Sequence, residues 1–596
     1  MAFDVDVNFD DKVISGTATA SVTVESESST LTLDTRDLHI ERVQLDGADL
    51  TFVLGEVHPV MGAPLVIELG TRMDAGTAFD VVITYRTSPS SSAVQWLRPE
   101  QTAGGTHPYL FTQCQAIHAR SLFPCQDTPG AKMTYSAKVT APDPLTALIS
   151  AIPLGEPADV GDGKRCFEFE QRVPIPPYLL ALAVGNVEAV EIGPRSKVWS
   201  EPEMVQAGAF EFAETEDFLK AAEQVAGPYV WGRYDLLLLP PSFPYGGMEN
   251  PCLTFVTPTL LAGDRSQAHV VAHEIAHSWS GNLVTNKTWE HFWLNEGFTV
   301  FIERKIMNKM YGKSVFDFNA IGGLMELKET VARLGESHPH SKVPYEKGFA
   351  FLVYLEHVTR GGGDGPEHAD AANGTPEFAE FLIGHFKRHQ YNTVDTDDFK
   401  TAYTARFPEA SAIVDWDAWL TKPGMPPVDV GLYYDGGSSE ASAELARRWH
   451  LCDVLGMGGE GTKPVGASAD DVKDFSSAQI DHFLLSLIEY RGGSHALSVN
   501  VVKSLDDLYG VSAMKNSEIR CKWLQLRLAA GDAGAFEPAR DMLTSQGRMK
   551  FLRPLYRSLS KSKAEGGVTF ARETFTDARN MYHPIAEKMV ASDLGM

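Results

Sequence analysis

The sequence predicts a multidomain α+β protein with an N-terminal antiparallel β-domain, a mixed α/β middle domain and a C-terminal all-α domain. Three observations support this fold class. The 596 residues are too many for one hydrophobic core. Residues 1–185 alternate between apolar and polar side chains, whereas residues 438–596 contain helix-length apolar segments. We place the middle domain at 186–421 and a proline-rich linker at 422–437.

The N-terminal domain is predicted from its period of two. Apolar and polar residues alternate over 14–24, and the pattern recurs at 79–85 and 133–139. Turn signals such as Asp46-Gly47 separate the candidate strands. The run 178–187 is continuously apolar, so we expect it to be the last buried strand of this domain.

The middle domain mixes helix and strand patterns. A helix is predicted to stop at Gly227-Pro228, and residues 236–239 indicate a short buried strand. We expect a further helix from Ser266, as its cap, to Gly281. Another helical stretch covers residues 293–307.

The last part of the chain is predicted to be helical. Residues 422–427 (KPGMPP) favour extended backbone, because proline denies a helix its hydrogen bonds. Apolar segments of helix length then follow, separated by glycines at 492–493, 510 and 531. This arrangement is typical of stacked helix pairs, although no repeat of fixed length is present.

Composition narrows the possible functions. Lysine and arginine total 52 against 78 acidic residues, which gives a net charge of −26. A surface this negative repels nucleic acid and anionic lipid, so we expect neither nucleic-acid binding nor stable membrane association. The start lacks a basic, apolar signal segment, and the six cysteines follow no disulfide or metal spacing. We expect a cytoplasmic monomer.

A possible metal centre lies in the middle domain. His273 and His277 are one helical turn apart, so both imidazoles can hold one Zn²⁺ while Glu274 acts on water. Catalytic zinc of this class needs three protein ligands, and Glu296 lies in the next helical stretch. The alternative is a pair of buried structural histidines beside a surface glutamate.

A second motif, Gly246-Gly247-Met248-Glu249-Asn250, precedes the histidines. Glycines let backbone lie close to an extended substrate, and a fixed carboxylate can pair with a protonated amine. Together the two motifs resemble those of the gluzincin zinc aminopeptidases. The segment 271–286 (VAHEIAHSWSGNLVTN) is similar to the leukotriene A4 hydrolase branch of that family, as are segments 113–118, 124–129, 344–348 and 547–550.

The resemblance implies a β saddle domain, a thermolysin-like catalytic domain, a C-terminal helical domain and one zinc ion per chain. It implies an aminopeptidase that acts on short peptides. The implied roles are zinc ligands for His273, His277 and Glu296; general base for Glu274; oxyanion stabilisation for Tyr345; amine binding for Glu249, with Gln115 in the same pocket; substrate contact for Gly246, Gly247 and Met248; and carboxylate binding for Arg548, with Lys550 as a second candidate.

Two alternatives remain at this point. Bifunctional members of the branch also hydrolyse a lipid epoxide with an Asp and a Tyr, and Ser337 and His340 stand at those positions here. Neither side chain reproduces that chemistry, so the sequence disfavours epoxide hydrolysis. The other alternative is a non-catalytic interaction scaffold. Glu274 argues against it, because a structural zinc site needs no general base.

Overall fold

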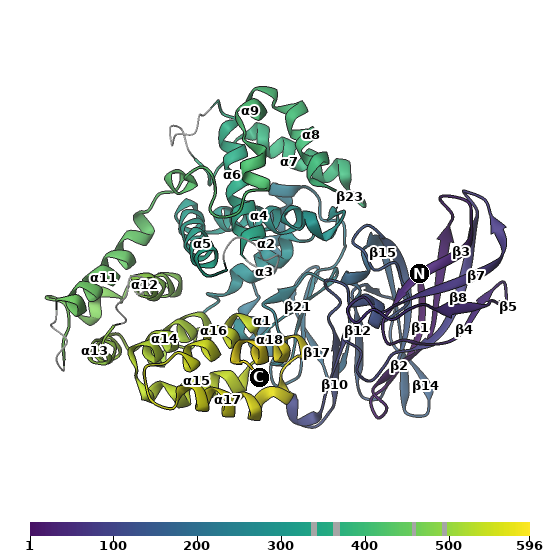
Figure 1. Ribbon diagram of the computed structural model, residues 1–596, viewed down its shortest axis with the longest axis horizontal. Helices are drawn as coiled ribbons and strands as arrows, with labels where there is room; N and C mark the ends of the chain where they lie inside the picture. The colour runs from purple at the N-terminus through teal and green to yellow at the C-terminus, as the bar shows by residue number, and fades with distance from the viewer. Residues whose placement is uncertain (335–341, 362–369, 456–460, 491–496) are drawn as a thin grey trace.

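The computed structural model describes residues 1–334, 342–361, 370–455, 461–490 and 497–596. Across these residues the chain folds into three regions (Figure 1). The N-terminal strands lie on the right of the view, the helices of the middle region at the top, and the C-terminal helices at the lower left. This arrangement confirms the predicted fold class.

The main N-terminal sheet has the strand order β13–β15–β11–β1–β2–β8–β4–β5. Strands β2, β8 and β11 coincide with the predicted alternating segments, and Ile14, Ala18 and Ala20 of β2 are buried. Neighbours pair antiparallel except β1 and β11, which pair in parallel. The bounds are β1 Ala2–Asn8, β2 Val13–Thr23, β4 His39–Leu45, β5 Ala48–Asp49, β8 Ala78–Arg86, β11 Met133–Pro142, β13 Ile152–Pro153, β14 Ala158–Gly161 and β15 Lys164–Ile175.

Two further sheets complete this region. One contains β3 (Ser28–Thr35), β7 (Ala63–Met73) and β6 (Phe52–Leu54); the other contains β12 (Thr146–Ile149), β16 (Leu182–Gly185), β10 (Tyr109–Thr112) and β9 (Val94–Leu97). The apolar run 178–187 is buried as predicted, but it is not one strand. Proline fixes φ and lacks an amide donor, so Pro177–Leu179 forms a 3-10 turn before β16 begins.

The middle region contains the sheet β17–β18–β19–β21–β20, whose edge strand β20 carries Gly247 and Met248. Helix α2 ends before Gly227, as predicted, and β19 covers most of the predicted strand at 236–239. The bounds are β17 Glu188–Gly193, β18 Ser196–Ser200, β19 Asp235–Leu238, β20 Gly247–Met248, β21 Leu253–Val256, α1 Val205–Glu211, α2 Thr215–Ala226, α3 Ala268–Ala276, α4 Trp293–Tyr311, α5 Lys313–Leu334, α6 Gly348–Val358, α7 Pro376–His389, α8 Thr396–Arg406, α9 Pro408–Ile413 and α10 Trp416–Leu420.

Helix α3 is shorter than the predicted 266–281. Arg265 adopts a left-handed φ of 61°, and the Ser266 hydroxyl accepts a hydrogen bond from Asn516 instead of capping the helix. At the other end, the Ser280 carbonyl contacts Nδ1 of His277 at 2.9 Å. The helix therefore ends at His277, one of the candidate metal ligands.

The C-terminal region is helical, as predicted. Gly510 and Gly531 adopt left-handed conformations at the ends of α13 and α14. The region docks on the middle region where the amide of Met549 donates to the carbonyl of Pro244 at 2.9 Å. The bounds are α11 Gly437–Val454, α12 Ser477–Tyr490, α13 Val499–Tyr509, α14 Ser517–Ala530, α15 Phe536–Ser545, α16 Met549–Ser560, α17 Gly567–Ala578 and α18 Pro584–Leu594. Within the described part of the chain, no helix is long and apolar enough to cross a membrane.

Candidate metal centre

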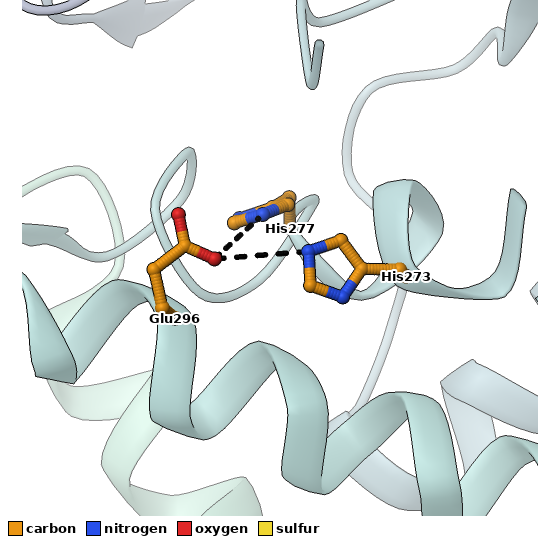
Figure 2. Close-up of side chains that lie close together, drawn as sticks. All are labelled: His273, His277 and Glu296. Carbon is orange, nitrogen blue, oxygen red and sulfur yellow. Dashed lines mark ion pairs between the residues drawn. The ribbon is translucent and has the colours of Figure 1, made fainter. Parts of the chain in front are cut away.

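Helices α3 and α4 pack together and bring three possible metal ligands to one point. Nε2 of His273 lies 3.7 Å from Oε2 of Glu296, and Nε2 of His277 lies 3.5 Å from the same oxygen. Figure 2 shows the three side chains pointing toward one another. The set matches the two-histidine, one-glutamate ligand type of catalytic zinc sites.

The opposite ring nitrogens are held by other groups. Nδ1 of His273 lies 2.9 Å from the carboxylate of Glu303, which is two helical turns beyond Glu296 on α4. Nδ1 of His277 lies 2.9 Å from the carbonyl of Ser280 and 3.1 Å from the hydroxyl of Thr299. These contacts place the donor proton on Nδ1 in each ring and leave Nε2 free for a metal.

The residues fit a cation on electrostatic grounds as well. Burial alone would lower the pKa of His277, but Glu249 and Glu296 outweigh this effect and raise the pKa to about 9. The pocket therefore attracts positive charge. Burial alone would raise the pKa of Glu296, whereas His277 and His273 lower it to about 2. Oε2 of Glu296 is buried and has no hydrogen-bond partner among the described residues. This is expected of an oxygen whose partner is a metal ion.

Glu274 lies beside this centre. Its side chain is buried, and its Oε2 makes no hydrogen bond within the described part of the chain. Burial raises its pKa to about 7. A Cβ built on Gly247 would overlap the Glu274 carboxylate, so a larger residue at this point of β20 would displace that carboxylate. The glycine therefore lets the edge strand lie directly against the carboxylate.

Glu249 follows β20 and is also buried. Its carbonyl accepts a hydrogen bond of 2.7 Å from Asn282, and its Oε1 lies 3.5 Å from Nε2 of Gln115. Burial raises its pKa, the nearby His277 opposes this shift, and Glu296 adds to it. Met248 is buried beside it, and its sulfur contacts Nε2 of Gln113 at 3.2 Å. Gln115 and Glu249 thus lie close together.

A second set of three possible ligands, Glu249, Glu274 and His277, shares one histidine with the first. We favour the first set because it contains both histidines whose Nδ1 atoms are already held. Using Glu274 as a ligand would also consume the carboxylate that is free to accept a proton.

Tyr345 stacks beside the metal centre. It lies in a π-helical turn, Val343–Lys347, and its ring is 6.3 Å from that of His273 at an interplanar angle of 21°. A close approach of α4 to α6 sets this position, since a Cβ on Gly297 would lie 2.8 Å from Cα of Gly348. Burial, together with Glu296 and Glu249, raises the pKa of Tyr345 well above its ordinary value, so its hydroxyl keeps its proton.

Arg548 reaches the site from the C-terminal region. Its guanidinium lies against Gly246, where a Cβ would be 2.6 Å from Nη2. Nη1 lies 3.4 Å from the hydroxyl of Thr259. Lys550 instead pairs with Glu518, at 2.8 Å. Ser337 and His340 lie outside the described residues.

These features define the class of the protein: a metallopeptidase with a zinc centre between two helices and the edge strand β20 beside it. The models of three families match: Peptidase M1 N-terminal domain over 2–179, Peptidase family M1 domain over 210–419, and Leukotriene A4 hydrolase, C-terminal, over 475–594. The chain belongs to peptidase family M1 and is a zinc aminopeptidase with the C-terminal domain of the leukotriene A4 hydrolase type.

Relatives and solved structures agree along the whole chain. The leukotriene A-4 hydrolase of Xenopus laevis is 45% identical and aligns over 100% of this chain and 96% of its own length. The leucine aminopeptidase 2 of Yarrowia lipolytica is 39% identical and aligns over 99% of this chain and 90% of its own length. The structure of yeast LTA4 hydrolase in complex with bestatin has a TM-score of 0.89 at 35% identity, covering 100% of this chain and 95% of that one.

Glu303 is a site residue that our reading of the sequence missed. The signal was present, because residues seven apart in a helix lie on one face, so Glu303 follows Glu296 along α4. We expect Glu303→Ala to weaken zinc affinity about 10- to 100-fold, because His273 loses the partner that orients it. Chelator competition measures this. Glu377→Ala, at an exposed position on α7, is the matched control, and equal zinc affinity in both variants would contradict the role.

Proposed function

We propose that this aminopeptidase releases the N-terminal residue from short peptides that carry a free C-terminal carboxylate. The observation that carries the proposal is a pair of opposite charges at two points of the segment 246–249 beside the candidate metal centre. Glu249 lies close to Glu274 and His277 and can hold an amine, while Arg548 lies against Gly246 and can hold a carboxylate. A peptide bound between them would present its first peptide bond to the centre.

His273, His277 and Glu296 would hold the zinc ion. When bound, zinc acts as a Lewis acid toward the scissile carbonyl and lowers the pKa of water toward about 7. The two Nδ1 contacts, to Glu303 and to the Ser280 carbonyl, would keep both imidazoles in place during the reaction.

Glu274 would act as the general base. Its Oε2 is buried and makes no hydrogen bond among the described residues, so it is available to take a proton from the attacking water. The same oxygen can then pass this proton to the leaving amine. Gly247 supports this role, because its missing side chain leaves room for the carboxylate beside the substrate strand.

Glu249 would select the free N-terminus. A buried carboxylate gains most from a partner of opposite charge, and the protonated α-amine of a peptide supplies one. Gln115, at 3.5 Å, would help to hold the carboxylate in place. Because the amine is held at a fixed place, only the first peptide bond reaches Glu274, and cleavage is limited to the first residue.

Tyr345 would stabilise the oxyanion that forms at the scissile carbonyl. Its raised pKa keeps the hydroxyl protonated, so it can donate a hydrogen bond as negative charge develops. A donor of this kind contributes about 3 kcal/mol to transition-state stabilisation in other enzymes. Gly246, Gly247 and Met248 would line the extended substrate.

Arg548 would bind the C-terminal carboxylate of the substrate. It is 6% exposed, and its Nε has no hydrogen-bond partner in the described ranges, so it retains donors for an anion. Lys550 is the weaker candidate for direct contact because Glu518 already pairs with it. A fixed site for each end of the peptide would favour substrates of a few residues.

A panel of aminoacyl chromogenic amides and short peptides, assayed with and without a chelator, tests the proposal. Leucine derivatives come first because relatives carry the name leucine aminopeptidase 2. We expect chelation to abolish hydrolysis and added zinc to restore it. N-acetylated copies of the same peptides are the control and should not be cleaved. Cleavage of acetylated peptides, or full activity without metal, would contradict the proposal.

Hydrolysis of a lipid epoxide is a second candidate function, favoured by the 45% identity to the leukotriene A-4 hydrolase of Xenopus laevis. Ser337 and His340 weigh against it, as the sequence indicated. Assaying an epoxide fatty acid alongside the peptides separates the two activities, and turnover at a rate comparable with that of peptides would establish the second.

We also propose that the enzyme acts as a monomer in the cytoplasm. All the residues assigned above come from one chain, so the site needs no partner subunit. All six cysteines are unpaired, and a reducing compartment keeps thiols in that state.

A further inference from the structure

Glu518 links the two basic residues at the proposed carboxylate site. It is the second residue of α14 and is 8% exposed. Its Oε1 lies 2.8 Å from Nζ of Lys550 and 3.6 Å from Nη1 of Arg548. The cations proposed to meet a substrate carboxylate therefore already face an internal one.

The contacts of the two cations with Glu518 are unequal. Lys550 makes a short, charge-assisted hydrogen bond. At 3.6 Å, Arg548 is too far for a hydrogen bond but close enough for a strong charge interaction. Lys550 thus forms a hydrogen bond with Glu518. Arg548 is attracted to Glu518 but does not donate a hydrogen bond to it.

The charges around Glu518 keep it ionised. Burial favours the protonated acid, but Lys550, Lys522 and Arg548 together lower the pKa of Glu518 below its ordinary value. Lys522 lies 3.9 Å from Glu518 and is itself held by Asp481, at 2.7 Å. Glu518 thus carries a negative charge beside Arg548 at neutral pH.

We propose that Glu518 is a specificity-determining residue that weakens the recognition of the substrate's C-terminal carboxylate by competing with it for the charge of Arg548. The inference rests on the proposed role of Arg548. A substrate carboxylate that binds Arg548 must approach a second carboxylate within a few ångström, and like charges at that distance repel.

This competition has a function in turnover. Removing the first residue leaves a product that keeps the same C-terminal carboxylate, so Arg548 holds substrate and product by the same contact. Binding that is equal in ground and transition states lowers KM without raising kcat, and tight product binding slows release. Glu518 limits that binding and so favours release of the shortened peptide.

Glu518→Gln tests the inference. The zinc-loaded full-length enzyme is assayed with a tripeptide and with the same tripeptide carrying a C-terminal amide. We expect KM for the free acid to fall about tenfold, while KM for the amide changes little. A change of about tenfold is a modest effect for the removal of one charge at a few ångström. We also expect kcat for the free acid to fall as product release becomes slower.

Asp481→Asn is the matched control. It removes a charge from the same network, but Asp481 contacts Lys522 rather than Arg548. We expect its ratio of KM for acid and amide to stay close to that of the wild type. Glu518→Asp is the second variant if Glu518→Gln does not fold: it withdraws the carboxylate by one methylene, and KM for the acid should fall by a smaller factor.

The outcomes separate this inference from the proposed function. If neither the wild type nor Glu518→Gln distinguishes acid from amide, the role of Arg548 itself is contradicted. A wild-type enzyme that prefers the acid, with an unchanged or weaker preference in Glu518→Gln, overturns the inference alone. Equal losses on both substrates also overturn it, because they indicate that Glu518 only maintains the local structure.

Discussion

Replacing Glu296 with glutamine is expected to remove zinc from the protein and to abolish aminoacyl-amide hydrolysis at the same time. Oε2 of Glu296 lies within 3.7 Å of Nε2 of both His273 and His277 and is buried, so it is placed to share one metal ion with both histidines. The amide has the same shape but no charge. We expect activity to fall by about 10³-fold or more, as for loss of a complete catalytic device.

Metal analysis of the purified variant, together with hydrolysis of a leucine amide, measures both effects. Glu290→Gln, at an exposed position six residues before Glu296, is the control and should keep both zinc and activity. If Glu296→Gln keeps stoichiometric zinc, then the other set, Glu249, Glu274 and His277, holds the metal, and our assignment of the ligands is wrong.

The parts of the site that the sequence predicts best are those set by local spacing. Two histidines four residues apart must face one way on a helix, and His273 lies in α3 while His277 is its C-cap in helical conformation. The apolar segment from Trp293 onward forms α4, which brings Glu296 to the histidines. Strands such as β2 and β8 were predictable for the same reason, since side chains that alternate between apolar and polar with a period of two are typical of a half-buried β-strand.

Other features depend on contacts between distant segments. Arg548 meets Gly246 across about 300 residues of sequence, and Glu518 approaches Arg548 only because α14 and α16 pack together. No local pattern contains that information. The late start of α3 has the same origin, since Asn516 reaches the hydroxyl of Ser266 from the C-terminal region.

Glu303 lies between these two cases. Its position on α4 follows from the helical period, but its role follows only from the fact that His273 lies between two carboxylates, one at each ring nitrogen. The sequence can place two glutamates on one face of a helix. Only the packing of α3 against α4 shows that they share a histidine.

Replacing Glu274 with glutamine is expected to leave zinc bound while lowering kcat about 10²- to 10⁴-fold, the usual contribution of a general base. Glutamine has nearly the same shape as glutamate, which matters here because Gly247 lies directly against the carboxylate and leaves no room for a larger group. Its amide cannot accept a proton from water. The histidines and Glu296 keep their positions, so metal content should match that of the wild type.

Three measurements on the same preparation decide the role of Glu274: zinc content, kcat and the inhibition constant of a peptide analogue that is not cleaved. Loss of kcat with zinc and inhibitor binding unchanged means that Glu274 acts in the chemical step. Loss of zinc as well would make it a ligand, as in the second set. An undiminished kcat would show that Glu274 is not the general base, and the buried, unpaired Oε2 of Glu274 would then have no chemical role.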